Sequence, residues 1–286
     1  MSYKPGLVTF LIPAKNEEAA IEATLRSLPR ATLAAAGFTT QVLVLDGRSL
    51  DATAELATRC GAEVMQDPGL GKATAIRSAR HRLRGDYIVM LDADGTYAPD
   101  AIPRLLAPLA WGEADLAIGD RTPVPGAMSP SHWVGNRLLS AAAAALYGRS
   151  CADLCTGLWA FRADAFADLP IRSRRFGLEA ELFAFASRLR LRVAHVTADY
   201  LPRQGRAKLR LGPDGARIVL RLLRSRFTAL PARATRPPRP ASDPTPSPLG
   251  SPATPLVPPL SGGLALPAAA LAVTPSERIE VGAGGP

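Results

Sequence analysis

Short apolar runs and helical patterns alternate along the first 120 residues. The apolar runs, each bounded by polar or turn-forming residues, span residues 7–12, 41–45, 62–65, 86–91 and 115–119. Runs of this length and β-rich composition are typical of buried strands. Helical patterns cover residues 16–28, 51–60, 72–83 and 99–109. This alternation predicts an α/β fold with a Rossmann-like, mostly parallel sheet and flanking helices.

The pattern changes beyond Arg121. Residues 122–134 are rich in Pro, Gly and Ser and are predicted to form a loop. The elements expected after it are a helix at 136–146, a helix at 179–189 and a strand at 192–200. Residues 151–162 are short and mixed in character.

Two segments of different composition follow the last predicted strand. Residues 211–228 are basic and amphipathic, with Arg217, Arg221 and Arg224 spaced at i, i+4 and i+7, which predicts a helix. From residue 229 onward Pro, Ala, Ser and Thr dominate without periodicity, which predicts a disordered tail. The predicted organisation is therefore a folded domain with two halves, a helix and a tail: residues 1–128, 129–210, 211–228 and 229–286.

The net charge of +9 is concentrated in one part of the chain. Residues 1–128 carry 13 basic and 15 acidic side chains, whereas residues 129–228 carry 17 and 7. An anionic partner is therefore expected along the second stretch. Few aromatic residues are interleaved with these basic ones, which argues against a nucleic-acid-binding module.

Cysteine content and hydropathy indicate the compartment. Three cysteines (Cys60, Cys151 and Cys155) are too few for a disulfide framework and favour a reducing environment. The N-terminal residues do not resemble a signal peptide, and no stretch reaches the roughly 20 apolar residues of a membrane span. We expect a cytoplasmic protein, peripheral on the inner face of the membrane.

The sharpest chemical feature is Asp92-Ala-Asp94, directly after the apolar run at 86–91. Ligands of doubly wound sheets bind beyond the carboxyl ends of the strands, which is where this pair is expected. Two carboxylates one residue apart suit a hard divalent cation, because Mg²⁺ takes oxygen ligands from carboxylates and substrate phosphates. Asp92 and Asp94 are therefore predicted to hold Mg²⁺ or Mn²⁺. A solvated turn is the alternative for such a pair taken alone.

Other motifs surround this pair in a fixed order. They read P-A-K-N-E at 13–17, D-G-R-S-L-D-A-T at 46–53, G-K-A-T-A-I-R at 71–77, D-A-D at 92–94 and G-D-R at 119–121. The combination resembles family-2 glycosyltransferases of the GT-A fold over roughly residues 7–210. The later segments D-L-C-T-G-L-W-A-F-R (153–162), F-G-L-E-A-E (176–181) and Y-L-P-R-Q-G-R-A-K-L (200–209) resemble the dolichol- or polyprenyl-phosphate sugar transferases within that family.

The resemblance implies a role for each matching residue. A nucleotide-sugar donor, carrying UDP or GDP, would contact Pro13, Ala14, Glu17, Asp46, Lys72, Arg77 and Asp92. Asp94 would bind the metal that bridges the diphosphate. Arg121, Arg137 and Arg203 would form an acceptor subsite for a polyprenyl phosphate, because arginine binds phosphate with a bidentate fork. Asp94, Arg121, Arg203 and Asp153 are the predicted catalytic set.

The chain departs from the resembled pattern at a few positions. Gly47 replaces a frequent second Asp, Lys15 replaces a frequent aromatic residue, and Thr96, Trp159 and Ala207 replace frequent Gln, Arg and Ser. These departures affect the choice of base and sugar, and they leave both metal-site acids in place. Glu179 and Glu181 are further candidates for orienting sugar or acceptor.

The implied function is metal-dependent, inverting sugar transfer to a polyprenyl phosphate at the membrane surface. A soluble phosphorylated acceptor stays open as an alternative. A nucleotidyltransferase is less favoured, because P-A-K-N-E-E stands where a glycine-rich phosphate loop would follow the first strand.

Overall fold

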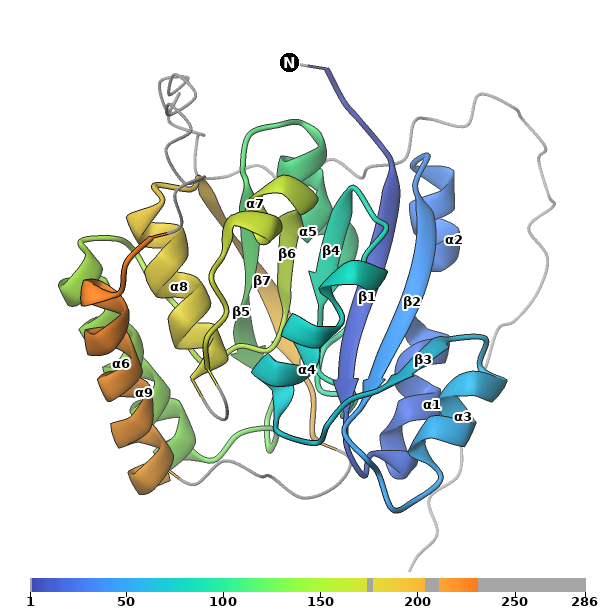
Figure 1. The fold of residues 1–286 in the computed structure, drawn as a ribbon, viewed down its shortest axis with the longest axis horizontal. Coiled ribbons are helices and arrows are strands. Elements are labelled where there is room, and N and C mark those ends of the chain that lie inside the picture. Colours follow the sequence, from blue (N-terminus) through green and yellow to red (C-terminus); the bar gives the residue numbers. More distant parts are fainter. Residues whose placement is uncertain (1, 174–176, 204–210, 231–286) are drawn as a thin grey trace, which may run out of the picture. The chain divides into compact units, whose positions relative to one another are not determined.

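The computed structural model describes residues 2–173, 177–203 and 211–230, including the backbone but not the side chains of residues 211–213 (Figure 1). The predicted tail begins at residue 229, and residues 231–286 of it lie outside the described residues. Ala207, one of the departures noted above, also lies outside them.

A seven-stranded sheet forms the centre of the fold, in the order β3-β2-β1-β4-β6-β5-β7. The strands are β1 (Leu7–Ala14), β2 (Thr39–Asp46), β3 (Glu63–Gln66), β4 (Tyr87–Met90), β5 (Leu116–Pro123), β6 (Trp159–Arg162) and β7 (Val193–Tyr200). All paired neighbours are parallel except those of β6, which runs antiparallel to β4 and β5. The predicted mostly parallel sheet is confirmed.

Helices cover both faces of the sheet (Figure 1). They are α1 (Glu18–Ser27), α2 (Arg30–Ala35), α3 (Thr53–Arg59), α4 (Lys72–Ser78), α5 (Ala101–Ala110), α6 (Pro130–Tyr147), α7 (Ala163–Asp168), α8 (Leu178–Arg188) and α9 (Leu211–Phe227), with a 3-10 turn η1 at Arg80–Arg82. One apolar cluster joins the sheet to α1, α2, α3 and α5, and a second joins it to α4, α6, α7, α8 and α9. Apolar residues alternate between the two clusters along β1, as expected for a strand buried on both faces.

Several predicted elements differ from those in the structure. The segment 122–134, predicted as a loop, contains the end of β5 and the start of α6, whose first turn is capped by the Ser129 side chain. The mixed segment 151–162 contains β6, a strand of four residues that is too short to show a pattern. The predicted helix at 72–83 is divided into α4 and η1.

The predicted amphipathic helix is present as α9, which packs against α6 and α8. Ile218 and Leu222 are buried in the core, whereas Val219, Leu220, Leu223 and Phe227 are exposed. On α6, the exposed apolar side chains are Trp133, Val134 and Leu138. None of the helices in the described parts of the chain is long and apolar enough to cross a membrane.

The two faces of α9 give a test of how this helix is attached. Leu222 is 1% exposed and Leu220 is 44% exposed. We expect Leu222→Ala to lower the free energy of unfolding by about 2–4 kcal/mol, because it leaves a cavity beneath the helix. Leu220→Ala on the same helix is the control and should cost less than about 1 kcal/mol. Urea unfolding measures both, and equal losses would contradict the docking of α9 through Leu222.

Candidate active site

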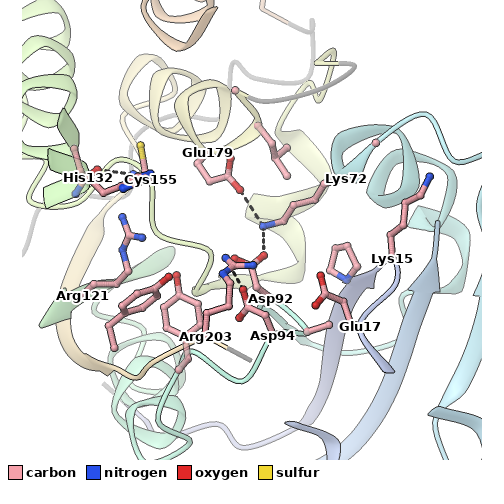
Figure 2. Close-up of a pocket in the computed structure, with 18 of the residues that line it drawn as sticks. Lys15, Glu17, Lys72, Asp92, Asp94, Arg121, His132, Cys155, Glu179 and Arg203 are labelled. Atoms are coloured by element: carbon pink, nitrogen blue, oxygen red, sulfur yellow. Dashed lines mark hydrogen bonds and ion pairs between the residues drawn. The ribbon is translucent and has the colours of Figure 1, made fainter. Parts of the chain in front are cut away.

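A cavity of about 950 Å³ opens at the carboxyl ends of the parallel strands. Its first end is lined by the last two residues of β1 and by residues that follow β1, β2 and β3: Pro13, Ala14, Lys15, Glu17, Gly47 and Asp67. Its other end is largely apolar and reaches α6, α8 and α9, where the lining includes Met128, Leu139, Leu154, Leu178 and Ile218. Charged side chains from several elements meet between the two ends (Figure 2).

Lys72 connects two acids across the middle of the cavity (Figure 2). Its Nζ lies 2.7 Å from Asp92 Oδ1 and 2.9 Å from Glu179 Oε1. Burial alone would raise the pKa of the Asp92 carboxyl, but the Lys72 ammonium outweighs it, so that pKa is lowered. Burial disfavours the charge on Lys72, and the two carboxylates nevertheless hold its pKa well above the ordinary value. Lys72 and Asp92 are therefore both charged at neutral pH.

Asp92 is held close to the backbone of the segment before β6. A Cβ added to Gly157 would lie 2.0 Å from Asp92 Oδ2, so any side chain at position 157 would displace the Asp92 carboxylate. The neighbouring Gly157 N–H donates to the Tyr97 hydroxyl, which also contacts Thr156 Oγ1 at 3.3 Å. The antiparallel strand β6 is what brings this segment against the end of β4.

Asp94 is buried and both of its oxygens have partners. The Thr96 hydroxyl donates to Oδ1 at 2.6 Å, and Arg203 Nη2 lies 2.6 Å from Oδ2. Burial disfavours the charge on Arg203, but Asp94 raises its pKa above the ordinary value. The resemblance assigned these two residues to metal and acceptor, and the structure brings them into direct contact.

Arg121 and Asp153 form a second, more deeply buried pair. Arg121 Nε and Nη2 bind the two Asp153 oxygens at 2.6 and 2.8 Å, and Asn136 donates to Asp153 at 2.9 Å. Burial opposes the charge on Arg121, and the hydrogen bonds to Asp153 outweigh it, so its pKa is raised further. The guanidinium carbon also lies 5.1 Å from the centre of the Tyr200 ring. Asp153 thus positions Arg121 at the cavity wall.

Four predicted site residues do not line the cavity: Asp153, which binds Arg121, and Asp46, Arg77 and Arg137. Asp46 is buried, and its carboxylate accepts the Ser49 N–H in the turn after β2. Arg77 reaches the Ile171 carbonyl, since five residues of α4 rotate it away from the direction of Lys72. Arg137 is exposed on α6 and lies 5.8 Å from the centre of the Trp133 ring.

The donor set around Asp92 and Asp94 fits a hard divalent cation. Two carboxylates at the end of one strand face the cavity, and Gly157 leaves the room that a side chain would take beside Asp92. The described residues contain no group of three or more His, Cys, Asp or Glu that could hold a metal. A cation here would therefore need substrate phosphates to complete its ligands, which is usual for Mg²⁺ sites.

Sequence reasoning missed several residues that shape this site. Asn136, Tyr97, Tyr200 and Gly157 act through contacts that join distant segments, and nothing in their spacing indicates them. Glu179 was weighed as a candidate, and its contact with Lys72 shows that it belongs to the cavity wall. Asp67 was not considered; its position after the short run at 62–65 was the available signal.

Comparisons with known proteins identify the family. Residues 9–169 match the family described as Glycosyl transferase family 2, and the chain belongs to it. It is 35% identical over 232 residues to the glycosyltransferase AglJ of Haloferax volcanii, covering 79% of this chain and 74% of that protein. It is 31% identical over 233 residues to an undecaprenyl-phosphate mannosyltransferase of Micrococcus luteus, covering 74% and 91%.

A solved structure supports the fold. Glucosyl-3-phosphoglycerate synthase from Mycobacterium tuberculosis, in complex with Mn²⁺, UDP-glucose and phosphoglyceric acid, aligns with a TM-score of 0.62 and 25% identity. The alignment covers 78% of this chain and 80% of that one. The fold is that of the GT-A glycosyltransferases, as the motifs predicted, and the chain is a glycosyltransferase.

Gly157 gives a test of the site that leaves every charged group in place. We expect Gly157→Ala to reduce sugar transfer by at least about 100-fold, because the new methyl group displaces Asp92. Gly215→Ala on α9 is the control: it adds the same methyl group at another glycine of the cavity lining, where a Cβ meets nothing within 4 Å, and should leave transfer near normal. Transfer from radiolabelled nucleotide sugar measures both. Near-normal transfer by Gly157→Ala would show that the position of Asp92 is unimportant.

Proposed function

We propose that this protein transfers a sugar from a nucleotide sugar, with a UDP or GDP leaving group, to a polyprenyl phosphate at a membrane surface. The observation that carries the proposal is the single cavity, which joins a charged end at the sheet to an apolar end between α6, α8 and α9. Arg121 and Arg203 border it between these ends. A polyprenyl phosphate fits this arrangement, because its phosphate could contact the two arginines while its apolar chain occupies the apolar end.

The donor is assigned to the end near β1, β2 and β4. Pro13, Ala14 and Glu17 line it. Asp92 and Asp94 lie beside the position proposed for the diphosphate. A divalent cation held by Asp92 and Asp94 would neutralise the charge on the leaving nucleoside diphosphate. Lys72, already placed between Asp92 and Glu179, is positioned to bind the diphosphate oxygens.

The acceptor is assigned to Arg203 and Arg121. A phosphate monoester has a second pKa of about 6, so it is mostly dianionic at neutral pH and needs no general base. One phosphate oxygen attacks the anomeric carbon as the bond to the nucleoside diphosphate breaks, which inverts the configuration. Arg203 would then exchange Asp94 for the acceptor phosphate, while Arg121 stays fixed by Asp153.

The membrane surface is assigned to the outer sides of α6 and α9, which pack side by side (Figure 1). Their exposed apolar side chains, including Leu138, Leu220 and Phe227, lie on helices that also expose Arg137 and Arg224. Arginines near an anionic surface contribute about 1 kcal/mol each. A lipid acceptor would enter the apolar end of the cavity from this side, where Ile218 of α9 lines it.

A soluble phosphorylated acceptor is the second candidate. It is favoured by the likeness to the synthase whose complex contains phosphoglyceric acid. Arg121 and Arg203 would bind the phosphate of either acceptor, so these two residues do not separate the candidates.

An acceptor assay with a change that keeps the side-chain shape and removes one negative charge tests the proposal. We expect the wild type to transfer sugar to undecaprenyl or dolichyl phosphate with Mn²⁺, and Asp94→Asn to lose at least about 100-fold, because a metal-binding carboxylate is removed. Asp100→Asn, an exposed acid paired with Arg104, is the control. Transfer to phosphoglyceric acid without transfer to either polyprenyl phosphate would contradict the lipid acceptor and support the soluble one. Equal rates for Asp94→Asn and wild type would remove Asp94 from the mechanism.

Vesicle binding tests the assigned membrane surface. We expect Leu220→Glu to weaken sedimentation with anionic vesicles by at least about tenfold, because one apolar contact becomes a charge repelled by the lipid. Leu50→Glu makes the same substitution at an exposed leucine in the turn after β2 and should leave vesicle binding unchanged. Equal effects of both substitutions would contradict the assignment to α9.

A further inference from the structure

Asp67 is a buried acid at the donor end of the cavity that the proposed mechanism does not use. It directly follows β3, the edge strand of the sheet. Gly47, which directly follows the neighbouring strand β2, lies close to it. Its residue surface is only 5% exposed, yet it lines the cavity. A buried carboxylate is unfavourable unless its oxygens have partners, so the partners of Asp67 indicate what this place is for.

Within the described part of the chain, one of its two oxygens accepts a hydrogen bond. Oδ1 accepts the Gly69 N–H and so closes the turn after β3. Among the residues that the structure describes, no hydrogen bond to Oδ2 is formed. A Cβ added to Gly47 would lie 3.5 Å from Oδ2, so no side chain on Gly47 separates this oxygen from the cavity.

The surroundings of Asp67 raise the pKa of its carboxyl above the ordinary value, chiefly through burial. Burial and the nearby Asp46 carboxylate raise its pKa, while the Gly69 N–H and the cations Lys15 and Arg48 oppose that rise. Asp46 itself is occupied by the Ser49 N–H and does not line the cavity. Among the residues that the structure describes, Asp67 therefore presents an acceptor oxygen without a hydrogen bond at this end of the cavity.

The position suits the base of a nucleotide. Three strand spacings separate β3 from β4 in the order β3-β2-β1-β4, which is about 14 Å. This is of the order of the length of an extended nucleoside diphosphate. A diphosphate placed at Asp92 and Asp94, beyond β4, would thus leave its base near the end of β3. This step depends on the proposed donor site.

We propose that Asp67 recognises the nucleobase of the donor through a ring N–H donated to Oδ2. An ionised carboxylate accepts hydrogen bonds and cannot donate them. Uracil has a ring N–H at N3 and guanine at N1, whereas cytosine and adenine present a bare nitrogen lone pair at the corresponding ring position. Asp67 therefore selects uridine or guanosine diphosphate donors over cytidine and adenosine ones.

Asp67→Asn separates recognition from the structural role of this residue. Asparagine keeps an oxygen for the Gly69 N–H and replaces Oδ2 with an amide that donates. The turn after β3 is retained, whereas a ring N–H now meets another donor. Asp67→Asn with Gly47→Asp is the second variant, because a carboxylate on residue 47 reaches the same space.

Calorimetric titration of the full chain, without acceptor, measures the effect. The probes are UDP, GDP, CDP and ADP, each with Mn²⁺, and pyrophosphate with Mn²⁺. We expect the wild type to bind UDP or GDP at least ~10-fold more tightly than CDP and ADP, and Asp67→Asn to lose at least ~10-fold for the preferred nucleotide. Pyrophosphate affinity should not change, and the double variant should regain part of the loss.

Unchanged binding of the preferred nucleotide by Asp67→Asn would overturn the proposal, and so would an equal loss for pyrophosphate. If the wild type binds no nucleoside diphosphate, both this inference and the proposed donor site are wrong. If nucleotides bind as expected but no sugar reaches a polyprenyl phosphate, the proposed acceptor alone is wrong.

Discussion

The site depends on the pairing of acids with the protein's own cations across the cavity. Asp92 and Asp94 lie one residue apart at the end of a buried strand, where two uncompensated carboxylates would repel each other. Lys72 neutralises one from α4, and Arg203 neutralises the other from the segment after β7. Both partners are side chains with some solvent exposure. In the proposed function a metal ion could replace them at the carboxylates, and the released cations could bind phosphate oxygens.

The sheet explains how one cavity could serve the two substrates of the proposed transfer. Parallel strands β1, β2 and β4 deliver Pro13, Gly47 and Asp92 to one edge, as doubly wound sheets do. The segment before the antiparallel strand β6 passes along the same edge. It positions Gly157 beside Asp92 and Asp153 beside Arg121. The part of the cavity proposed for the acceptor is thereby joined to the part proposed for the donor by short, buried contacts, and Ile218 of α9 lines its far end.

Sequence alone predicted the features that depend on local pattern. The parallel strands, the D-x-D acids at the end of β4 and the amphipathic helix α9 all have periodic or compositional signals, and the structure contains them. The contacts of Arg121 with Asp153, and of Lys72 with Glu179, join segments 32 and 107 residues apart, and no local spacing encodes them. Arg77 and Arg137 were expected at the cavity, and the rotation of α4 and α6 turned them away from it.

The competition of Arg203 with a metal ion for Asp94 is the most direct test of this account. Free Mn²⁺ is measured by electron paramagnetic resonance during titration of wild type and Arg203→Ala, without nucleotide. The account predicts that Arg203→Ala binds Mn²⁺ more tightly than wild type, because Asp94 Oδ2 loses its competing cation. Equal or weaker binding by Arg203→Ala would contradict it.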